Sequence, residues 1–294
     1  MKYDKVILIG AGKIVLDILK DLVRMQKQWG YELLVMEYEP YLISSVEKMC
    51  QENDVTCCRF HGDKQALTAK LNELEDSVLI VSAGNTYLFP KEIVSKANIG
   101  IINFHQALLP KYRGRNASTW AIYMGEEKSG ATWHWVNAGV DTGRIIWQGE
   151  CPIGNDTKAY ELSKDIMNKA HEGFLEIIED ILQGNSRSFP QPECEKTSKI
   201  YYSYEVPGEG RFSIKDGAKD IYRLLRSVDY GLSPVFPKMK TELYDGRTIE
   251  ILSYKKIKQS VDREICTGEY IIEDNRIYLP LDVDNELVLK FREL

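Results

Sequence analysis

The chain has 294 residues, of which 44% are hydrophobic and 28% charged, and its formal net charge is −6. This composition is typical of a soluble globular protein with one large domain or two ordinary ones. No apolar run approaches the roughly 20 residues of a membrane span, and the N-terminus leads straight into an expected strand. We therefore expect a cytoplasmic protein with no secretory signal and no membrane partner. Six cysteines without a Cys-x-x-Cys pair, beside four histidines, predict reduced thiols and no metal site.

Strands and helices alternate through the first third of the chain. Apolar runs predict buried strands of the parallel type at 6–9, 32–36, 78–82 and 99–104, with a further short strand at 55–60. Helical periodicity places helices between them, at 14–24, 41–52, 64–74 and 90–95. This alternation predicts an α/β fold with a Rossmann-like, parallel-rich sheet.

The middle of the chain continues this fold and then leaves it. We expect a short helix at 117–123, strands at 131–136 and 144–148, and a long helix at 158–182 that packs on the sheet. The stretch 184–198 contains two prolines and no periodicity, which indicates a linker.

The last third of the chain has a different pattern, one helix followed by short strands that turn residues join. The helix is expected at 215–228 and the strands at 238–243, 248–253, 269–272, 277–281 and 286–291, with an Asp-Gly hairpin turn at 245–246. We therefore expect a main domain over 1–185, a linker over 186–200 and a small β-rich domain over 201–294.

A glycine-rich turn follows the first strand. Gly10-Ala-Gly12, with Glu37 at the end of the next strand, fits a dinucleotide fingerprint except that Val15 stands where the third glycine belongs. Two interpretations are open here. One is a protein that binds NAD, and the other is a tight strand-to-helix turn that holds no nucleotide.

The most informative stretch runs from Ile102 to Asp141. Asn103 and His105 end a strand two residues apart, so their side chains should point to one face. Asp141 follows in a loop. An amide, an imidazole and a carboxylate supply an oxyanion donor, a proton acceptor and a group that orients the acceptor, which together suit acyl transfer.

The motifs in this stretch resemble those of the folate-dependent formyltransferases. The sequence contains NxHxxLLPxYRG from Asn103 to Gly114 and GVDTG from Gly139 to Gly143. The family includes methionyl-tRNA formyltransferase, glycinamide ribonucleotide transformylase and the nucleotide-sugar N-formyltransferases, and the motifs are most similar to the last group. The resemblance implies 10-formyltetrahydrofolate as the donor co-substrate, and it implies that Asn103, His105 and Asp141 are catalytic. It also favours the nucleotide-free interpretation of the glycine turn.

Further implications of the resemblance rest on position alone. The first domain would be the formyltransferase domain, and the last an oligonucleotide-binding-like barrel, as in methionyl-tRNA formyltransferase. The folate pocket would be formed by two loops, with residues Leu88, Phe89, Val136, Gly139, Val140 and Asp141.

Two other groups of residues leave alternatives open. A basic cluster of Lys111, Arg113 and Arg115 is either a solvated loop or an anion clamp beside the amine acceptor. His134, between two tryptophans of an expected strand, is either a packed strand residue or a pocket residue, and we favour the packed residue.

The charge of the last domain bears on the acceptor. From Tyr201 onward there are 15 Lys and Arg against 17 Asp and Glu, a net charge of −2. A tRNA-binding domain needs clustered cations, so tRNA is an unexpected partner. We expect a small amine, foremost that of an amino-sugar nucleotide, and keep methionyl-tRNA and a carrier-bound amino acid as alternatives. A formyltetrahydrofolate hydrolase would show the same three residues, and a homodimer is compatible with the sequence.

Overall fold

The computed structural model describes residues 2–39, 44–192, 199–260, 265 and 269–294. Residues 41–43 of one expected helix and 193–198 of the expected linker lie outside this description. Contacts divide the chain into two compact units. Unit 1 comprises 1–117, 128–152 and 163–201, and unit 2 comprises 118–127, 153–162 and 202–294.

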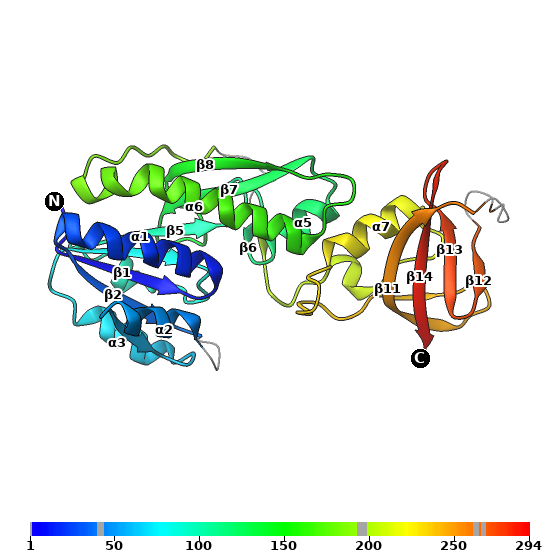
Figure 1. Cartoon of the computed structure of the whole chain (residues 1–294), viewed down its shortest axis with the longest axis horizontal. Helices are drawn as coiled ribbons and strands as arrows, with labels where there is room; N and C mark the ends of the chain where they lie inside the picture. Colours follow the sequence, from blue (N-terminus) through cyan, green and yellow to red (C-terminus); the bar gives the residue numbers. More distant parts are fainter. Residues whose placement is uncertain (1, 40–43, 193–198, 261–264, 266–268) are drawn as a thin grey trace. The chain divides into compact units, whose positions relative to one another are not determined.

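Unit 1 is built on a seven-stranded sheet in the order β3-β2-β1-β4-β5-β7-β8 (Figure 1). Its strands are β1 (Lys5–Gly10), β2 (Glu32–Glu37), β3 (Thr56–Arg59), β4 (Val78–Ala83), β5 (Ile99–His105), β7 (Lys128–Trp135) and β8 (Ile145–Pro152). The first five run parallel, and β7 and β8 join antiparallel at one edge. The expected parallel-rich α/β fold is therefore confirmed.

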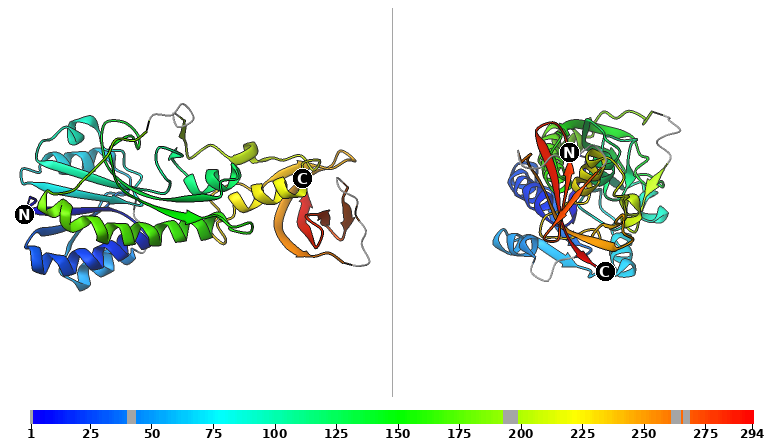
Figure 2. Two further views of the ribbon diagram at one scale, coloured as in Figure 1. Left: turned by 90° about the horizontal axis from the view of Figure 1, so that it is seen from above. Right: turned by 90° about the vertical axis from the view of Figure 1, so that its right-hand side faces the viewer.

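Helices cover both faces of this sheet. The long helices α1 (Lys13–Trp29) and α6 (Ala159–Gln183) lie side by side, and His171 Nε2 of α6 is 2.6 Å from Asp21 Oδ2 of α1 (Figures 1 and 2). The other face buries one apolar cluster that includes side chains of α3 (Lys64–Asn72) and α4 (Lys91–Val94). A further helix, α2 (Ser45–Glu52), begins at Ser44, whose hydroxyl caps the helix by accepting from the Glu47 N–H.

The glycine turn after β1 has a packing explanation. A Cβ at Gly10 would lie 1.7 Å from the carbonyl oxygen of Ala83, so the close approach of β1 and β4 requires glycine there. Val15 is fully buried. Glu37 is also buried, and both of its carboxylate oxygens accept from the Ser44 hydroxyl at 2.7 Å. A carboxylate engaged in this way does not face a ribose, which favours the nucleotide-free interpretation.

A small ladder completes unit 1, and a short helix follows it in the chain. The strand β6 (Arg113–Gly114) pairs in parallel with β9 (Ile200–Tyr201), a pairing that the sequence did not predict. The expected helix 117–123 is present as α5 (Ala117–Tyr123). The segment that follows α6 thus returns to the loop that carries the basic cluster.

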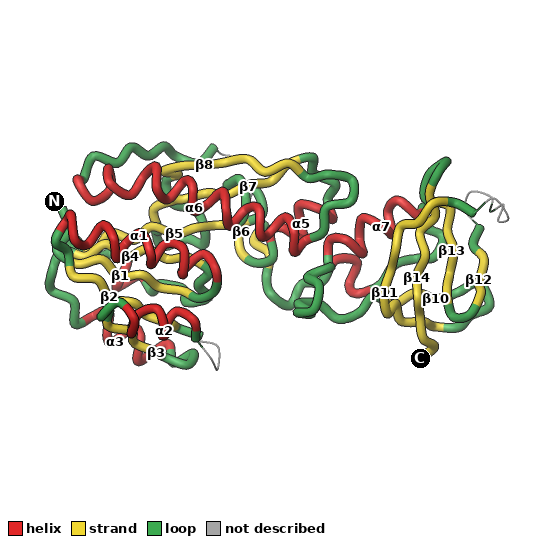
Figure 3. Tube along the Cα trace, in the orientation of Figure 1, coloured by secondary structure: helices red, strands yellow, loops and turns green. Residues whose placement is uncertain are grey.

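Unit 2 contains an antiparallel sheet in the order β10-β11-β14-β13-β12 (Figure 3). Its elements are the 3-10 helix η2 (Pro207–Gly210), the helix α7 (Ala218–Ser227), and the strands β10 (Lys240–Glu242), β11 (Thr248–Lys258), β12 (Ile271–Glu273), β13 (Arg276–Pro280) and β14 (Asn285–Glu293). Ile221, Leu224 and Leu225 of α7 pack into a core with the sheet. The expected small β-rich domain is confirmed. Its closure into a barrel stays a prediction, because no pairing of β10 with β12 is seen among the described residues.

Two segments that we expected to lie wholly within the first domain, 118–127 and 153–162, cluster with unit 2. They do so through specific bonds inside that unit. The Lys158 ammonium is 2.9 Å from the Asp229 carboxylate, and Arg226 donates to the carbonyl oxygen of Thr157 at 2.6 Å. Independent folding of 1–185 and 201–294, with 186–200 as their linker, stays a prediction.

No helix within the described ranges is long and apolar enough to cross a membrane. The same residues contain no group of three His, Cys, Asp or Glu side chains that could hold a metal ion.

Candidate active site

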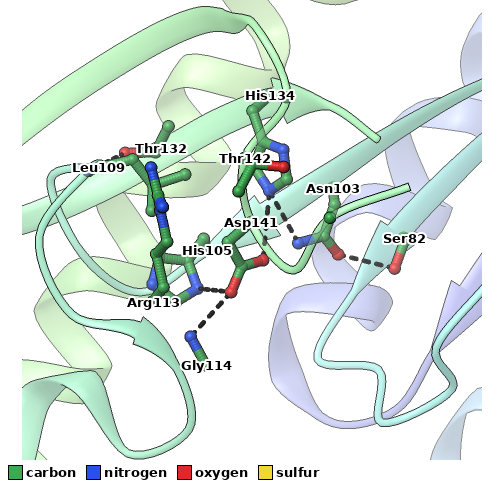
Figure 4. Close-up of polar contacts among 12 residues, drawn as sticks. Ser82, Asn103, His105, Leu109, Arg113, Gly114, Thr132, His134, Asp141 and Thr142 are labelled. Atoms are coloured by element: carbon green, nitrogen blue, oxygen red, sulfur yellow. Dashed lines mark hydrogen bonds and ion pairs between the residues drawn. The ribbon is translucent and has the colours of Figure 1, made fainter. Parts of the chain in front are cut away.

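Polar side chains gather where β4, β5 and β7 run side by side, and they are called the polar cluster below. Asn103 pairs with Ser82 of β4 on one side and with His134 of β7 on the other. His105 follows two residues later and is only 5% exposed. The predicted common face of Asn103 and His105 is therefore the face that Ser82 and His134 also occupy (Figure 4).

Asp141 reaches this cluster from the loop between β7 and β8. Its backbone has a positive φ of 51°, a left-handed conformation that an L-residue adopts at a cost. Its Oδ2 accepts from the Gly114 N–H at 2.9 Å and lies 3.4 Å from His105 Nδ1. Its Oδ1 lies 3.5 Å from His134 Nε2. One carboxylate thus faces two imidazoles and a main-chain donor (Figure 4).

The hydrogen bonds of His105 determine its tautomer. Nε2 lies 2.8 Å from the Tyr112 carbonyl oxygen, which can only accept, so Nε2 carries the proton. In the neutral ring Nδ1 is then unprotonated and faces Asp141. We expected Asp141 to fix the tautomer, but the Tyr112 carbonyl does so. Nδ1 is therefore the nitrogen that can take up a proton, and the resulting imidazolium would lie beside a carboxylate.

The amide of Asn103 is oriented from two sides. Its Oδ1 accepts from the Ser82 hydroxyl at 2.8 Å, and its Nδ2 lies 3.2 Å from His134 Nε2. His134 Nδ1 lies 2.9 Å from the Trp135 carbonyl oxygen and must donate to it, which leaves Nε2 as the acceptor for the amide. One amide N–H is thus used, and the second has no acceptor among the described residues.

Burial and charge act in opposite directions on this cluster. Burial lowers the pKa of His105 below its ordinary value, and the Asp141 carboxylate offsets this effect only in part. Burial alone would raise the pKa of Asp141, but the positive charge of a protonated His105 or His134 and the Gly114 N–H lower it. At neutral pH the site therefore holds a neutral His105 beside an ionised Asp141.

The sequence left one member of the cluster as the less favoured of two interpretations and did not indicate another. His134 was interpreted as a packed strand residue, and it is indeed 2% exposed, but it is also bonded to the candidate catalytic amide. Ser82 was not singled out at all. Both owe their place to cross-strand register, which apolar patterns do not fix. The nearest available signal was that Asn103 and His134 lie in adjacent expected strands.

The loop after β5 is held by the buried hydroxyl of Thr132. This hydroxyl donates to the Ala107 carbonyl at 2.5 Å and accepts from the Leu109 N–H at 3.1 Å. In the basic cluster beyond this loop, Lys111 and Arg115 are exposed. Arg113 is partly buried and lies beside the site, with its Nη2 3.1 Å from Gln191 Oε1 (Figure 4). The structure thus separates Arg113 from the other two cations.

The residues expected to line a folate pocket lie in two loops of unit 1. Phe89 and Val136 pack against the same apolar cluster, while Leu88 is 65% exposed. Two main-chain donors of the second loop are already used, because the Val136 N–H bonds Ile101 and the Gly139 N–H bonds the Asn137 side chain. Val140 is half-buried. Donor recognition by these residues stays a prediction.

Residues 42–178 match the model of the family described as "Formyl transferase". The methionyl-tRNA formyltransferase of Clostridioides difficile is 28% identical over 236 residues, which cover 76% of this chain and 74% of that protein. Residues 42–178 of the chain belong to the formyl transferase family. The protein is accordingly a transferase enzyme, and Asn103, His105 and Asp141 lie together within these residues.

Solved structures of N-formyltransferases share the fold. The N-formyltransferase of Helicobacter canadensis, in complex with folinic acid and dTDP-3-aminofucose, gives a TM-score of 0.70 at 15% identity and covers 98% of this chain and 99% of its own. A sugar 3N-formyltransferase in the presence of dTDP and 5-N-formyl-THF gives 0.69 at 16% identity, with 98% and 97% covered. At these identities the likeness concerns the fold.

Proposed function

We propose that this enzyme transfers the formyl group of 10-formyltetrahydrofolate to the primary amine of an amino-sugar nucleotide. The observation that carries the proposal is the cluster of Asn103, His105 and Asp141, in which the buried imidazole of His105 lies 3.4 Å from the Asp141 carboxylate and the Asn103 amide lies on the same face. The names of the similar structures support both substrates, since they include folinic acid and an amino-sugar nucleotide.

The chemistry follows from the bonds of the three residues. The folate donor would supply the formyl group, and attack by the amine nitrogen would form a C–N bond while the old one breaks. Asn103 can donate its second N–H to the oxygen that becomes negative. His105 can accept the proton of the attacking nitrogen at Nδ1 and return it to the leaving nitrogen. Asp141 stabilises the imidazolium in between.

The residues of the expected donor pocket have the chemical character that binding of a folate requires. Phe89, which follows β4, and Val136, which follows β7, present partly buried apolar surface, and Leu88 adds an exposed apolar side chain. A flat pterin ring is bound by such surface together with a few main-chain polar groups. Gly139, Val140 and Asp141 belong to the loop that would provide these groups.

The paired charges of unit 2 support a small acceptor over tRNA. Lys256 lies 3.0 Å from the Asp156 carboxylate, and Arg292 lies 2.6 Å from that of Glu250. Arg247 pairs with Asp245 at 2.7 Å. Cations already paired with carboxylates contribute less to binding phosphates, and the net charge from Tyr201 onward is −2. The partly buried Arg113 would then contact the phosphates of the acceptor, with Lys111 and Arg115 as exposed neighbours.

A panel of acceptors tests the proposal directly. The enzyme would be mixed with 10-formyltetrahydrofolate and, in turn, with amino-sugar nucleotides, methionyl-tRNA and a carrier protein bearing an amino acid, and tetrahydrofolate release would be followed. We expect turnover with an amino-sugar nucleotide and none with the Asn103→Ala variant. Preferential turnover of methionyl-tRNA, the substrate named by the sequence relatives, would refute the choice of acceptor.

The same assay separates two other functions. Release of formate at an equal rate with and without amines would identify a formyltetrahydrofolate hydrolase, whose three residues would look identical. An NAD-binding protein would be stabilised against heat by NAD and not by a folate analogue. The buried, hydrogen-bonded Glu37 leads us to expect the opposite.

A further inference from the structure

The segment after α6 continues along the active-site loops. Phe189 forms a two-bond bridge with Ile145 at the start of β8, with its N–H and carbonyl at 2.9 and 2.8 Å from their partners. Arg144 Nε donates to the Ser188 hydroxyl at 3.0 Å. These contacts fix the backbone on the C-terminal side of the Asp141 loop. They bring Gln191, which the sequence assigned to a linker, to that loop.

The side chain of Gln191 uses all of its polar groups there. Its Nε2 donates to the carbonyl oxygens of Asp141 and Gly143, both at 2.8 Å, and its Oε1 accepts from Arg113 at 3.1 Å. A carbonyl only accepts and a guanidinium only donates, so the amide can sit in one orientation only. A single side chain therefore connects the left-handed turn at Asp141 with the cation beside the site.

The opposite side of the same loop is closed independently. Asn137 Oδ1 accepts from the Gly139 N–H at 3.1 Å and from the Thr142 hydroxyl at 2.6 Å. These bonds shape the loop but do not touch the Asp141 main chain. A positive φ at an aspartate persists where its surroundings enforce it. The Gly114 N–H holds the Asp141 side chain, and the two Gln191 bonds hold the main chain on either side of Thr142.

We infer that Gln191 is a positioning residue of the active site, which holds the Asp141 carboxylate against His105 through the main chain of residues 141 and 143. The effect on catalysis rests on the proposed function, whereas the effect on His105 does not. The charged and titratable groups that face His105 are Asp141, His134 and Arg113. Of these, Asp141 raises the His105 pKa, so a released carboxylate lets that pKa fall.

Three variants of Gln191 distinguish the role of its hydrogen bonds from that of the bulk of its side chain. Gln191→Met keeps the length of the side chain and removes every hydrogen bond. Gln191→Glu keeps an acceptor for Arg113 but places oxygen against the two carbonyls. Gln191→Ala removes the side chain. The control is Gln51→Met, a glutamine exposed on α2. The wild-type enzyme and each variant are compared by NMR titration of labelled histidines, with the His105 signal assigned from a His105→Asn variant.

We expect a lower His105 pKa in Gln191→Met and Gln191→Ala and an unchanged one in Gln51→Met, whereas Gln191→Glu adds a carboxylate of its own and is compared by its rate alone. In the formyl-transfer assay we expect kcat to fall about tenfold to hundredfold with a smaller change in the donor KM, because misplacement of a reacting group acts mainly on kcat. An unchanged His105 pKa in Gln191→Met would overturn the inference, and so would a wild-type kcat in Gln191→Glu. Absence of formyl transfer in the wild type would count only against the proposed function, since the titration needs no turnover.

Discussion

The β4–β5–β7 region of unit 1 and the sheet of unit 2 use polar residues in opposite ways. In the first, His105 and His134 are buried beside the partly buried Asp141, and each bond restricts the protonation or orientation of the next. In the second, pairs such as Lys256–Asp156 lie at the surface. Buried polar groups are costly unless satisfied and so indicate function, whereas surface pairs contribute about 0–1 kcal/mol and indicate little. This difference explains why the formyl chemistry is better defined than the acceptor.

The largest expected contrast comes from removing the cluster itself. Asn103→Ala, His105→Ala and Asp141→Ala should each fold and lose most activity, and loss of the Asn103 oxyanion donor should lower kcat by about 10²–10³. Asp245→Asn, at an exposed turn of unit 2, is the control and should leave kcat unchanged. Circular dichroism and steady-state rates check both. Near-full turnover in two of the three alanine variants would refute the assignment.

A second contrast concerns the glycine that meets Asp141. A Cβ at Gly114 would lie 2.2 Å from the Tyr201 carbonyl oxygen, and its φ is +94°. Gly114→Ala should therefore lose at least the roughly 1–3 kcal/mol of a left-handed alanine, and activity with it, because the β6–β9 ladder must shift.

Gly62→Ala is the matched control for this variant, since φ there is +78° with open space around the Cβ. It should show the backbone cost alone and keep full activity. Equal losses of unfolding free energy in the two variants would show that the β6–β9 ladder accommodates the added methyl group. Denaturant unfolding and steady-state rates measure the difference.

The acid limb of the pH profile of kcat/KM should lie below the ordinary pKa of a histidine. A mechanism that needs neutral His105 keeps its kcat/KM until the pH falls through the His105 pKa, which burial lowers below the ordinary value of about 6.5. His134 contributes to that lowering, so His134→Gln should move the acid limb to higher pH. His171→Gln, on α6, should leave the limb unchanged. A limb at or above pH 6.5 in the wild type would contradict the assignment of His105 as the neutral base.

The smallest effect is expected on the surface of unit 2. Lys255 and Lys258 are both exposed on β11. The double variant Lys255→Glu with Lys258→Glu should leave kcat/KM for an amino-sugar nucleotide unchanged, because we expect no contact between these lysines and the phosphates of a small acceptor. A tRNA acceptor would respond differently, with binding that weakens strongly between low and moderate salt. Rates of the wild type and the double variant at two salt concentrations check this. A loss confined to methionyl-tRNA would favour the sequence relatives' substrate.

Much of the fold was predictable because it depends on local patterns. Apolar runs located the strands of the parallel sheet, and the two-residue repeat of a strand placed Asn103 and His105 on one face. The motif added Asp141.

The rest depends on distant pairings that no local pattern encodes. His134 and Ser82 join the site through strand register. Gln191 joins it through side-chain hydrogen bonds, although it lies in a segment with the composition of a linker. Tyr112 contributes a carbonyl, a group that every residue carries, so its identity could not have revealed its part in fixing the His105 tautomer.

The interleaved units have a consequence for anyone who recombines this family. Segments 118–127 and 153–162 belong by contact to unit 2, where Asp156 meets Lys256 and Thr119 meets Tyr230. A chimera joined at Tyr201 would exchange the last third of the chain and leave these two segments facing a foreign surface. Successful exchange of the second unit between relatives should therefore require five matched crossovers, so that both internal segments are exchanged together with 202–294.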